Sequence, residues 1–207
     1  MEHRPISRMI SRGGEDELLS FHQIHGKNLE LSANGRVASR KQGFDRALCP
    51  ISPSISKHRT YFLRITKTNE KWKGGLSIAL SAELPRNGKD LPRNAAEGGV
   101  GSQRLVNDNS PANAASGGWL FVRIQLRNQQ MIGSWISFRV DVNTSPPLLR
   151  YGVNGELESS EPIDDACLMN CIDMGQDIWA LVDVFGAVTE VELLGVYGIH
   201  LTFRRLA

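Results

Sequence analysis

Two histidines three residues apart, His22 and His25, are the first side chains in this sequence whose chemistry could serve catalysis or metal binding. A zinc site needs three or four ligands that meet at one point. On an extended segment, side chains three apart point to opposite faces, and no nearby cysteine or carboxylate completes a ligand set. We therefore expect no metal at this pair and assign both histidines a structural or surface role.

The cysteines, carboxylates and glycine-rich segments show no stronger sign of catalysis. Cys167 and Cys171 lie four apart, without a second cysteine or histidine pair to complete a zinc site. Glu190 and Glu192 share one strand face, where solvated carboxylates are common. The sequence has no G-x-S-x-G nucleophile motif and no Walker phosphate loop. We therefore predict no catalytic site, no cofactor and no metal. A triad of residues distant in the sequence would leave no local motif, so that alternative stays open.

Length, charge and composition narrow the function classes. The 207 residues suit one domain of ordinary size, and 41% hydrophobic with 22% charged residues is typical of a globular chain. A net charge of +2 is small beside the basic excess of nucleic-acid-binding domains, so we expect no nucleic-acid partner. No apolar run reaches the roughly 18 residues of a membrane-spanning helix, and the N-terminus lacks a signal peptide's apolar centre. With an odd number of cysteines as well, we expect a cytoplasmic protein without a membrane segment.

Period-two alternation marks the elements that would hold any site. In WISFRVDV, residues 135–142, apolar side chains occupy every second position, which predicts one buried and one exposed face. Asn34-Gly35 and Asn154-Gly155 predict hairpin turns, because a type I′ turn needs positive φ at both central residues. About eight to ten such strands, with turn signals between them, predict an all-β, antiparallel β-sandwich. Helical periodicity is nearly absent, and only residues 163–170 could hold one short helical turn.

The four tryptophans, Trp72, Trp119, Trp135 and Trp179, stand at or near strand starts. We expect them to pack in the core of the sandwich. Trp72 differs, because it follows the polar stretch TKTNEK and precedes two glycines. An aromatic residue at a strand mouth can anchor a partner, so recognition is the alternative role for Trp72.

Segments without strand periodicity divide the chain. Residues 1–19 are charged and aperiodic, which predicts a disordered N-terminal tail. Residues 84–117 are rich in proline, glycine, asparagine and alanine, which predicts a long flexible insertion. The domain itself is predicted over residues 20–197, and residues 198–207 are predicted to form a C-terminal tail.

Four segments of the chain carry a pattern of motifs in a characteristic order. The first begins at FHQIHGKNLELS, and the pattern continues in KWKGGLSIAL, RYGVNGE and DIWALVDVFGAVTEVELL. Together these segments resemble the neuralized homology repeat domain of the Neuralized family over about residues 21–197. The motif residues of the opening segment are Phe21, His22, His25, Gly26, Asn28, Leu31, Ser32, Gly35, Ala38, Arg40 and Phe44.

The resemblance implies a sandwich of the SPRY/concanavalin-like type that binds protein partners through loops at one end. Neuralized-type proteins join this domain to a RING finger or a SOCS box and direct clients to ubiquitination. The closing segment is most similar to single-repeat members that carry a SOCS box and work in muscle, so residues 198–207 could be a truncated entry into such a box. The implied partners are client proteins, some with short asparagine-containing peptide motifs, and elongin/cullin or RING ligase subunits.

We therefore predict a protein-interaction module, not itself an enzyme, that recruits substrates to an E3 ubiquitin ligase complex. Two alternatives stay open: a stand-alone scaffold without ligase association, and an enzyme or carbohydrate-binding sandwich. For each predicted partner-binding residue, a purely structural role in a turn is the competing interpretation. These residues are Asn34, Arg36, Trp72, Asn154, Phe185 and Gly186.

Overall fold

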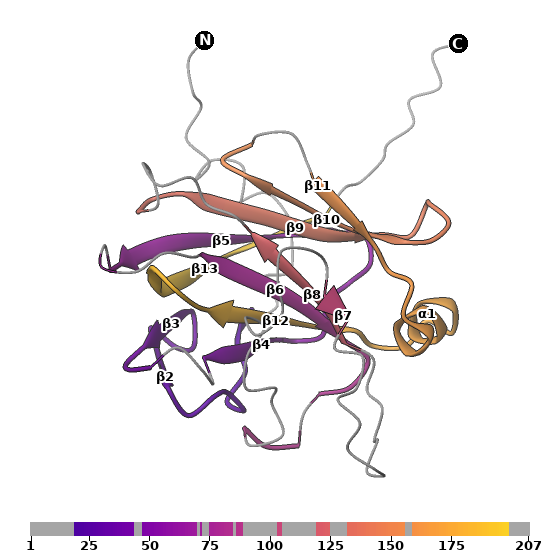
Figure 1. Cartoon of the computed structure of the whole chain (residues 1–207). Coiled ribbons are helices and arrows are strands. Elements are labelled where there is room, and N and C mark those ends of the chain that lie inside the picture. Colours follow the sequence, from indigo (N-terminus) through magenta and orange to yellow (C-terminus); the bar gives the residue numbers. More distant parts are fainter. Residues whose placement is uncertain are drawn as a thin grey trace.

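Two antiparallel sheets make up most of the described part of the chain. The computed structural model describes residues 19–43, 47–69, 71, 75–84, 86–88, 103–104, 119–124, 132–155 and 159–198. In sheet order, the seven-stranded sheet contains β11 (Ser159–Pro162), β10 (Leu148–Val153), β9 (Trp135–Asp141), β5 (Arg59–Thr68), β13 (Val188–Gly198), β3 (Val37–Arg40) and β2 (Leu29–Ser32). The six-stranded sheet contains β1 (Ser20–Phe21), β4 (Leu48–Ser52), β12 (Trp179–Val184), β6 (Leu76–Ser81), β8 (Trp119–Ile124) and β7 (Gln103–Arg104). The sheets stack as two layers (Figure 1), which confirms the predicted antiparallel β-sandwich.

Side chains from the facing sides of the two sheets form one hydrophobic core. Strand β9 contributes Ile136, Phe138 and Val140, each at most 1% exposed, which confirms the alternation predicted for this segment. Phe138 stacks on Tyr61 of β5, with ring centroids 5.4 Å apart. Burial of apolar surface on this scale is the main driving force for folding. The second sheet contributes core residues that include Ala180, Val182 and Val184 of β12.

The prediction that the tryptophans pack in this core is wrong for Trp135 and Trp179. Trp135 lies on the outer face of β9, where its ring contacts Phe62 with centroids 5.8 Å apart. Trp179 packs against a small second cluster around Leu181, on the face of β12 that points away from the main core. Each tryptophan stands one residue before the first core residue of its strand, so strand alternation turns it outward. The side chains of the other two tryptophans lie outside the described residues.

Both predicted Asn-Gly turns are present. Asn34 and Gly35 have φ values of 57° and 80°, and the Arg36 N–H closes this turn with a hydrogen bond of 3.1 Å. Asn154 and Gly155 have φ values of 53° and 77°. Glycine and asparagine tolerate this left-handed region better than other residues, which is why these dipeptides predict turns correctly.

The helix α1 (Ala166–Asp173) lies where the sequence predicted only a short helical turn. The Asp165 side chain accepts hydrogen bonds from two N–H groups of its first turn, at 2.9 and 3.0 Å. At the other end, the Lys57 ammonium donates to the Ile172 carbonyl. These caps supply hydrogen-bond partners to backbone groups at both ends of the helix that would otherwise have none within it. No helix in the described part of the chain is long and apolar enough to cross a membrane.

The predicted tails and the predicted insertion remain predictions. Residues 1–18 and 199–207 lie outside the described residues, as does most of the segment 84–117. Inside that segment, β7 pairs with β8, and Gly88 lies against the backbone of His25. Leu19, at the end of the predicted N-terminal tail, packs in the core.

Candidate functional site

The turn at residues 185–187 joins β12 to β13 at the end of the sandwich away from α1 (Figure 1). Gly186 has a φ of 60°, and the Val188 N–H donates to the Phe185 carbonyl at 3.2 Å. The Asn69 N–H, just beyond β5, donates to the Ala187 carbonyl at 2.7 Å. We call this turn, together with residues 41–43, 69 and 71, the loop end. It presents the partly exposed side chain of Phe185 on a tethered turn.

Arg40, the last residue of β3, joins two segments of the loop end. Its guanidinium donates to the carbonyls of Gly43 and Gly186, and to the Val188 carbonyl at 3.2 Å. A guanidinium carries five N–H donors in a fixed plane, so one side chain can bind several carbonyls at once. The segment after β3 and the turn after β12 are therefore held together by one residue.

The Arg40 guanidinium is partly withdrawn from water. Burial lowers the pKa of Arg40, and the negative charge of Asp183 acts in the opposite direction. Asp183 is only 5% exposed and belongs to β12, three residues before Gly186. An opposite charge offsets part of the cost of desolvating a cation. Asp183 thus stabilises the charged Arg40 at the loop end.

Asn154, a predicted partner-binding residue, uses its side chain within the fold. Its Oδ1 accepts from the Trp135 N–H at 2.9 Å, and its Nδ2 donates to the Ser134 hydroxyl at 3.2 Å. Its own N–H donates to the Trp135 carbonyl at 2.9 Å. These bonds tie the β10–β11 turn to the start of β9. The contacts of Asn154 therefore support the structural interpretation of this residue.

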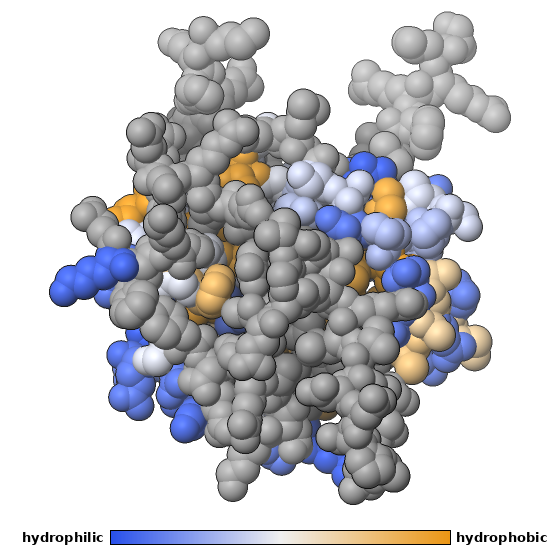
Figure 2. Space-filling model, in the orientation of Figure 1, coloured by the Kyte–Doolittle hydropathy of each residue, from blue (hydrophilic) through white to orange (hydrophobic). Residues whose placement is uncertain are grey.

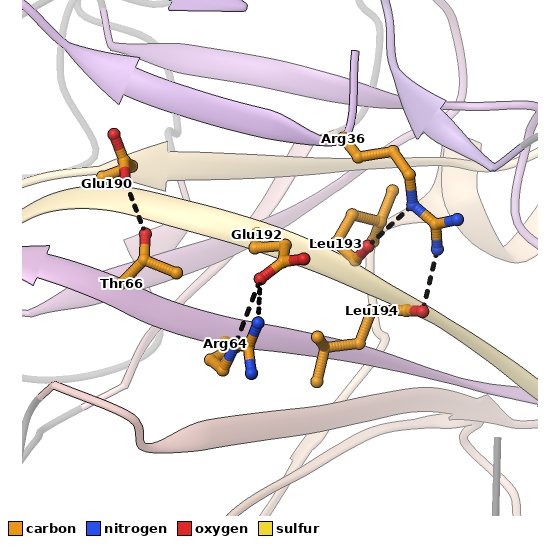
Figure 3. A network of polar contacts seen from close by, with 7 residues as sticks. All are labelled: Arg36, Arg64, Thr66, Glu190, Glu192, Leu193 and Leu194. Atoms are coloured by element: carbon orange, nitrogen blue, oxygen red, sulfur yellow. Dashed lines mark hydrogen bonds and ion pairs between the residues drawn. The ribbon is translucent and has the colours of Figure 1, made fainter. Parts of the chain in front are cut away.

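Asn34 and Arg36 lie at the opposite end of β3 from Arg40. Arg36 Nε donates to the Leu193 carbonyl at 3.2 Å, and its Nη2 donates to the Leu194 carbonyl at 2.8 Å (Figure 3). The pairing of β13 with β5 shifts register just after Leu193. Such a bulge disrupts the ladder hydrogen bonds, and here Arg36 supplies donors to the bulged strand. Arg36 is therefore committed to the structure of β13.

The predicted partner-binding residues thus separate into groups. Phe185 and Gly186 lie at the loop end, whereas Asn34 and Arg36 lie at the far end of β3. Asn154 is next to Trp135, which pairs with Arg64 near the middle of β5. Trp72 lies outside the described residues, close in sequence to Lys71 of the loop end. The structure brings together only part of the predicted surface.

A polar network on the outer face of the seven-stranded sheet joins β3, β13 and β5 (Figure 3). Glu190 accepts from the hydroxyls of Ser39 and Thr66 at 2.6 and 2.9 Å, and pairs with Lys67 at 2.6 Å. Burial alone would raise the pKa of Glu190, but the hydrogen bonds from Lys67, Ser39 and Thr66 outweigh it and lower the pKa. Glu192 pairs with Arg64. These carboxylates have partners across the strands, as expected for a structural face.

Replacing Glu190 with glutamine is expected to reduce the free energy of unfolding by about 1 to 2 kcal/mol at pH 7, because charge-assisted hydrogen bonds are lost. Since the pKa of Glu190 is lowered in the folded state, its contribution is fully present above the unfolded pKa. The contribution then disappears as the pH falls through the folded pKa. Urea unfolding at pH 7 and at pH 3 should therefore show a gap between the two proteins that shrinks in acid.

The Glu192→Gln variant is the matched control for this prediction. The Glu192 side chain, which pairs with Arg64, is 28% exposed, whereas that of Glu190 is 13% exposed. Exposed pairs contribute about 0 to 1 kcal/mol, so Glu192→Gln should change stability less. Equal losses for the two variants at pH 7 would contradict the role assigned to Glu190.

His22, Cys49 and Cys171 take structural positions. His22 Nδ1 accepts from the Ile24 N–H at 2.9 Å, its ring lies edge-on to Trp179, and burial lowers its pKa. Burial raises the pKa of the thiols of Cys49 and Cys171, which disfavours the reactive thiolate. Among the described residues, no group of three histidine, cysteine or acidic side chains is arranged to hold a metal ion.

Arg40 and Asp183 were not among the predicted site residues, although the sequence held a signal for each. Arg40 shares strand parity with Ala38, a core residue, so its side chain points toward the interior at the end of β3. Asp183 interrupts the apolar run WALVDV, and charged residues in such runs are rarely buried without a partner. The bonds from Arg40 to Gly186 and Val188 join segments distant in the sequence, and the sequence does not reveal them.

Comparison with known proteins identifies relatives over most of the chain. A family model described as Neuralized matches residues 21–195. E3 ubiquitin-protein ligase NEURL1B of Homo sapiens is 27% identical over 178 residues, covering 84% of this chain and 27% of that protein. Protein neuralized of Drosophila melanogaster is 22% identical over 177 residues, covering 85% of this chain and 20% of that protein. The chain thus spans about a fifth to a quarter of the length of these curated relatives.

Two solved structures share the architecture. The crystal structure of the neuralized-nhr1 domain from Drosophila melanogaster superposes with a TM-score of 0.61 at 22% identity, covering 85% of this chain and 97% of that one. The solution structure of the NEUZ (NHR) domain in Neuralized from the same organism gives 0.61 at 21% identity, covering 88% and 95%. Both likenesses show a common fold.

Proposed function

Because the chain belongs to the Neuralized family, we propose that it is a protein-binding domain that recruits a substrate protein to an E3 ubiquitin ligase. The observation that carries this proposal is the family match over residues 21–195, together with a relative named as an E3 ubiquitin-protein ligase. A β-sandwich suits such a role, since its rigid sheets hold loops that can vary without loss of the core.

We place the partner surface at the loop end. Phe185 is a partly exposed aromatic residue on a turn tied to both β5 and β3. Aromatic side chains on rigid supports are enriched among residues that dominate binding energy. Lys71 belongs to the same end, and Trp72, the next residue along the chain, stays a proposed contact. Arg36 and Asn154 are left out of this surface because their side chains bind the fold itself.

Affinity purification of the tagged chain, followed by mass spectrometry and reconstitution with the recovered proteins, tests the function. We expect a recurrent client together with elongin/cullin or RING ligase subunits, and ubiquitination of the client that depends on this chain. A client that binds directly but is never ubiquitinated would favour the scaffold without ligase association. Absence of any directly binding client would contradict the proposal. A client that is recovered can then be mapped with overlapping peptides, including those with asparagine-containing motifs.

Replacing Phe185 with alanine is expected to weaken client binding about tenfold, which corresponds to roughly 1.4 kcal/mol. Calorimetric titration of the purified client measures the change, and circular dichroism shows that the variant is folded. The matched control is Asn34→Gly, at the far end of β3. Glycine adopts the positive φ of Asn34 without strain, so this variant should fold and bind normally. Weaker binding by the control alone would place the partner surface at the other hairpin tip.

A further inference from the structure

We propose that Arg40 is a positioning residue that holds the loop end in its binding-competent shape. The inference rests on the proposed function and names the residue on which the arrangement of that surface depends. Arg40 donates hydrogen bonds within the protein and does not itself contact the partner. The 41–43 segment and the 185–187 turn, which it joins, form the surface that contacts the partner. With one side chain, Arg40 bonds to both the 41–43 segment and the 185–187 turn.

The bonding pattern of Arg40 is what singles it out. The Gly43 carbonyl lies just after β3, whereas the carbonyls of Gly186 and Val188 lie in or next to the turn after β12. All three acceptors are backbone carbonyls, so these bonds fix the position of the backbone itself. Fixing them with one planar guanidinium sets the distance between two segments that are about 140 residues apart in sequence.

Two backbone bonds also hold the turn. The Val188 N–H donates to the Phe185 carbonyl, and the Asn69 N–H donates to the Ala187 carbonyl. Neither bond uses the carbonyl of Gly186, which Arg40 binds. Without Arg40, the turn would lose its connection to β3, and its two remaining backbone bonds would open more often. Phe185 would then occupy several positions in the free protein, and ordering it on binding would reduce affinity.

Burial explains why arginine suits this position. Asp183 offsets part of the desolvation cost, and the guanidinium stays charged in a partly buried place where an ammonium would be harder to keep desolvated. Lysine has the same charge but three donors on a flexible stem, so it cannot reproduce the planar arrangement. We therefore expect Arg40→Lys to retain the fold and to restore the positioning only partly.

Hydrogen–deuterium exchange of the full chain and affinity for the recovered client test the proposal together. In Arg40→Met, which keeps an apolar stem, exchange of the Val188 and Asn69 amides, which donate the two backbone bonds of the turn, should accelerate about tenfold as the turn opens more often. Client affinity should fall about fivefold, since the turn is no longer pre-organised. Arg40→Lys should fall between wild type and Arg40→Met in both measurements, and it replaces the methionine variant if that protein does not fold.

Arg36→Met is the matched control, because Arg36 occupies the other end of β3 and also donates to two backbone carbonyls. It should lower the melting temperature but leave exchange of the 185–187 turn and client affinity within about twofold of wild type, because its bonds go to β13 outside the loop end. A general loss of stability would change turn exchange and client affinity in both arginine variants alike. A positioning role of Arg40 would change these two quantities in Arg40→Met but not in Arg36→Met.

Three results would overturn the inference. Unchanged exchange of the turn in Arg40→Met would mean that Arg40 does not hold it. Faster exchange with unchanged client affinity would make Arg40 a structural residue only, while leaving the proposed function intact. A wild-type chain without any client would remove the proposed function and the binding role of Arg40 with it, and the exchange data would still decide whether Arg40 orders the turn.

Discussion

Replacing Phe138 with alanine should reduce the free energy of unfolding by about 3 to 5 kcal/mol. Phe138 is 1% exposed on β9 and stacks on Tyr61 at the centre of the sandwich. The substitution removes the aromatic ring and leaves a cavity that close-packed neighbours fill only partly. Since domains of this size are stable by about 5 to 15 kcal/mol, this loss is a large fraction of the total free energy of unfolding. Chemical denaturation monitored by tryptophan fluorescence measures the loss.

Phe62→Ala is the matched control for this prediction. Phe62 belongs to β5, the strand next to β9, but it points to the outer face and is only partly buried beside Trp135. Its replacement should cost clearly less, about 1 to 2 kcal/mol, because less apolar surface is buried there. If Phe62→Ala were the more destabilising of the two, the assignment of inner and outer faces to the seven-stranded sheet would be wrong.

The second large effect is expected for Gly88→Ala. A Cβ at this position would lie 2.3 Å from the carbonyl oxygen of His25, far inside van der Waals contact. The His25 backbone cannot retreat easily, because the N–H of the next residue, Gly26, donates to Leu48 of β4 at 2.8 Å. We expect a loss of about 1 to 3 kcal/mol, as is usual when a methyl group is forced into a closely packed site. Thermal unfolding followed by circular dichroism measures it.

The exposed neighbour Arg86 provides the control for the glycine variant. Arg86→Ala changes the same segment without adding a Cβ against His25, and exposed substitutions of this kind usually change stability by less than about 0.5 kcal/mol. If Gly88→Ala and Arg86→Ala were equally stable, the backbone at His25 would be able to move away from the added Cβ at little cost. The start of the connection between β6 and β8 would then be independent of the N-terminal segment.

The stability effect of Phe138→Ala arises away from the loop end, and this separation helps to interpret binding data. Phe138 lies in the core, whereas Phe185 and Arg40 belong to the loop end. A variant that lowers stability without changing client affinity therefore reports on the sandwich. A variant that lowers affinity at unchanged stability reports on the proposed partner surface.

Local features of the fold could be predicted from the amino-acid sequence because they depend on a few neighbouring residues. Asn34-Gly35 and Asn154-Gly155 predicted their turns, since positive φ is a property of those residue types. The alternation in residues 135–142 predicted the buried face of β9, because strand side chains alternate whatever the strand pairs with. The ordered family motifs predicted the family and its sandwich architecture. The family match confirms the first, and the two antiparallel sheets confirm the second.

The arrangement of the candidate site depends on contacts between segments distant in the sequence, and these appear only in the tertiary structure. Strand order brings Arg40 to Gly186 and Val188, and it places Arg36 beside β13 at the other end of β3. Both arginines occur in the same strand pattern, yet one joins the loop end and the other supports a bulge. Pattern and propensity specify which way a side chain points along its own strand. The register and packing between strands decide which backbone carbonyls lie within reach of that side chain. The energies of register and packing come from contacts between segments distant in the sequence.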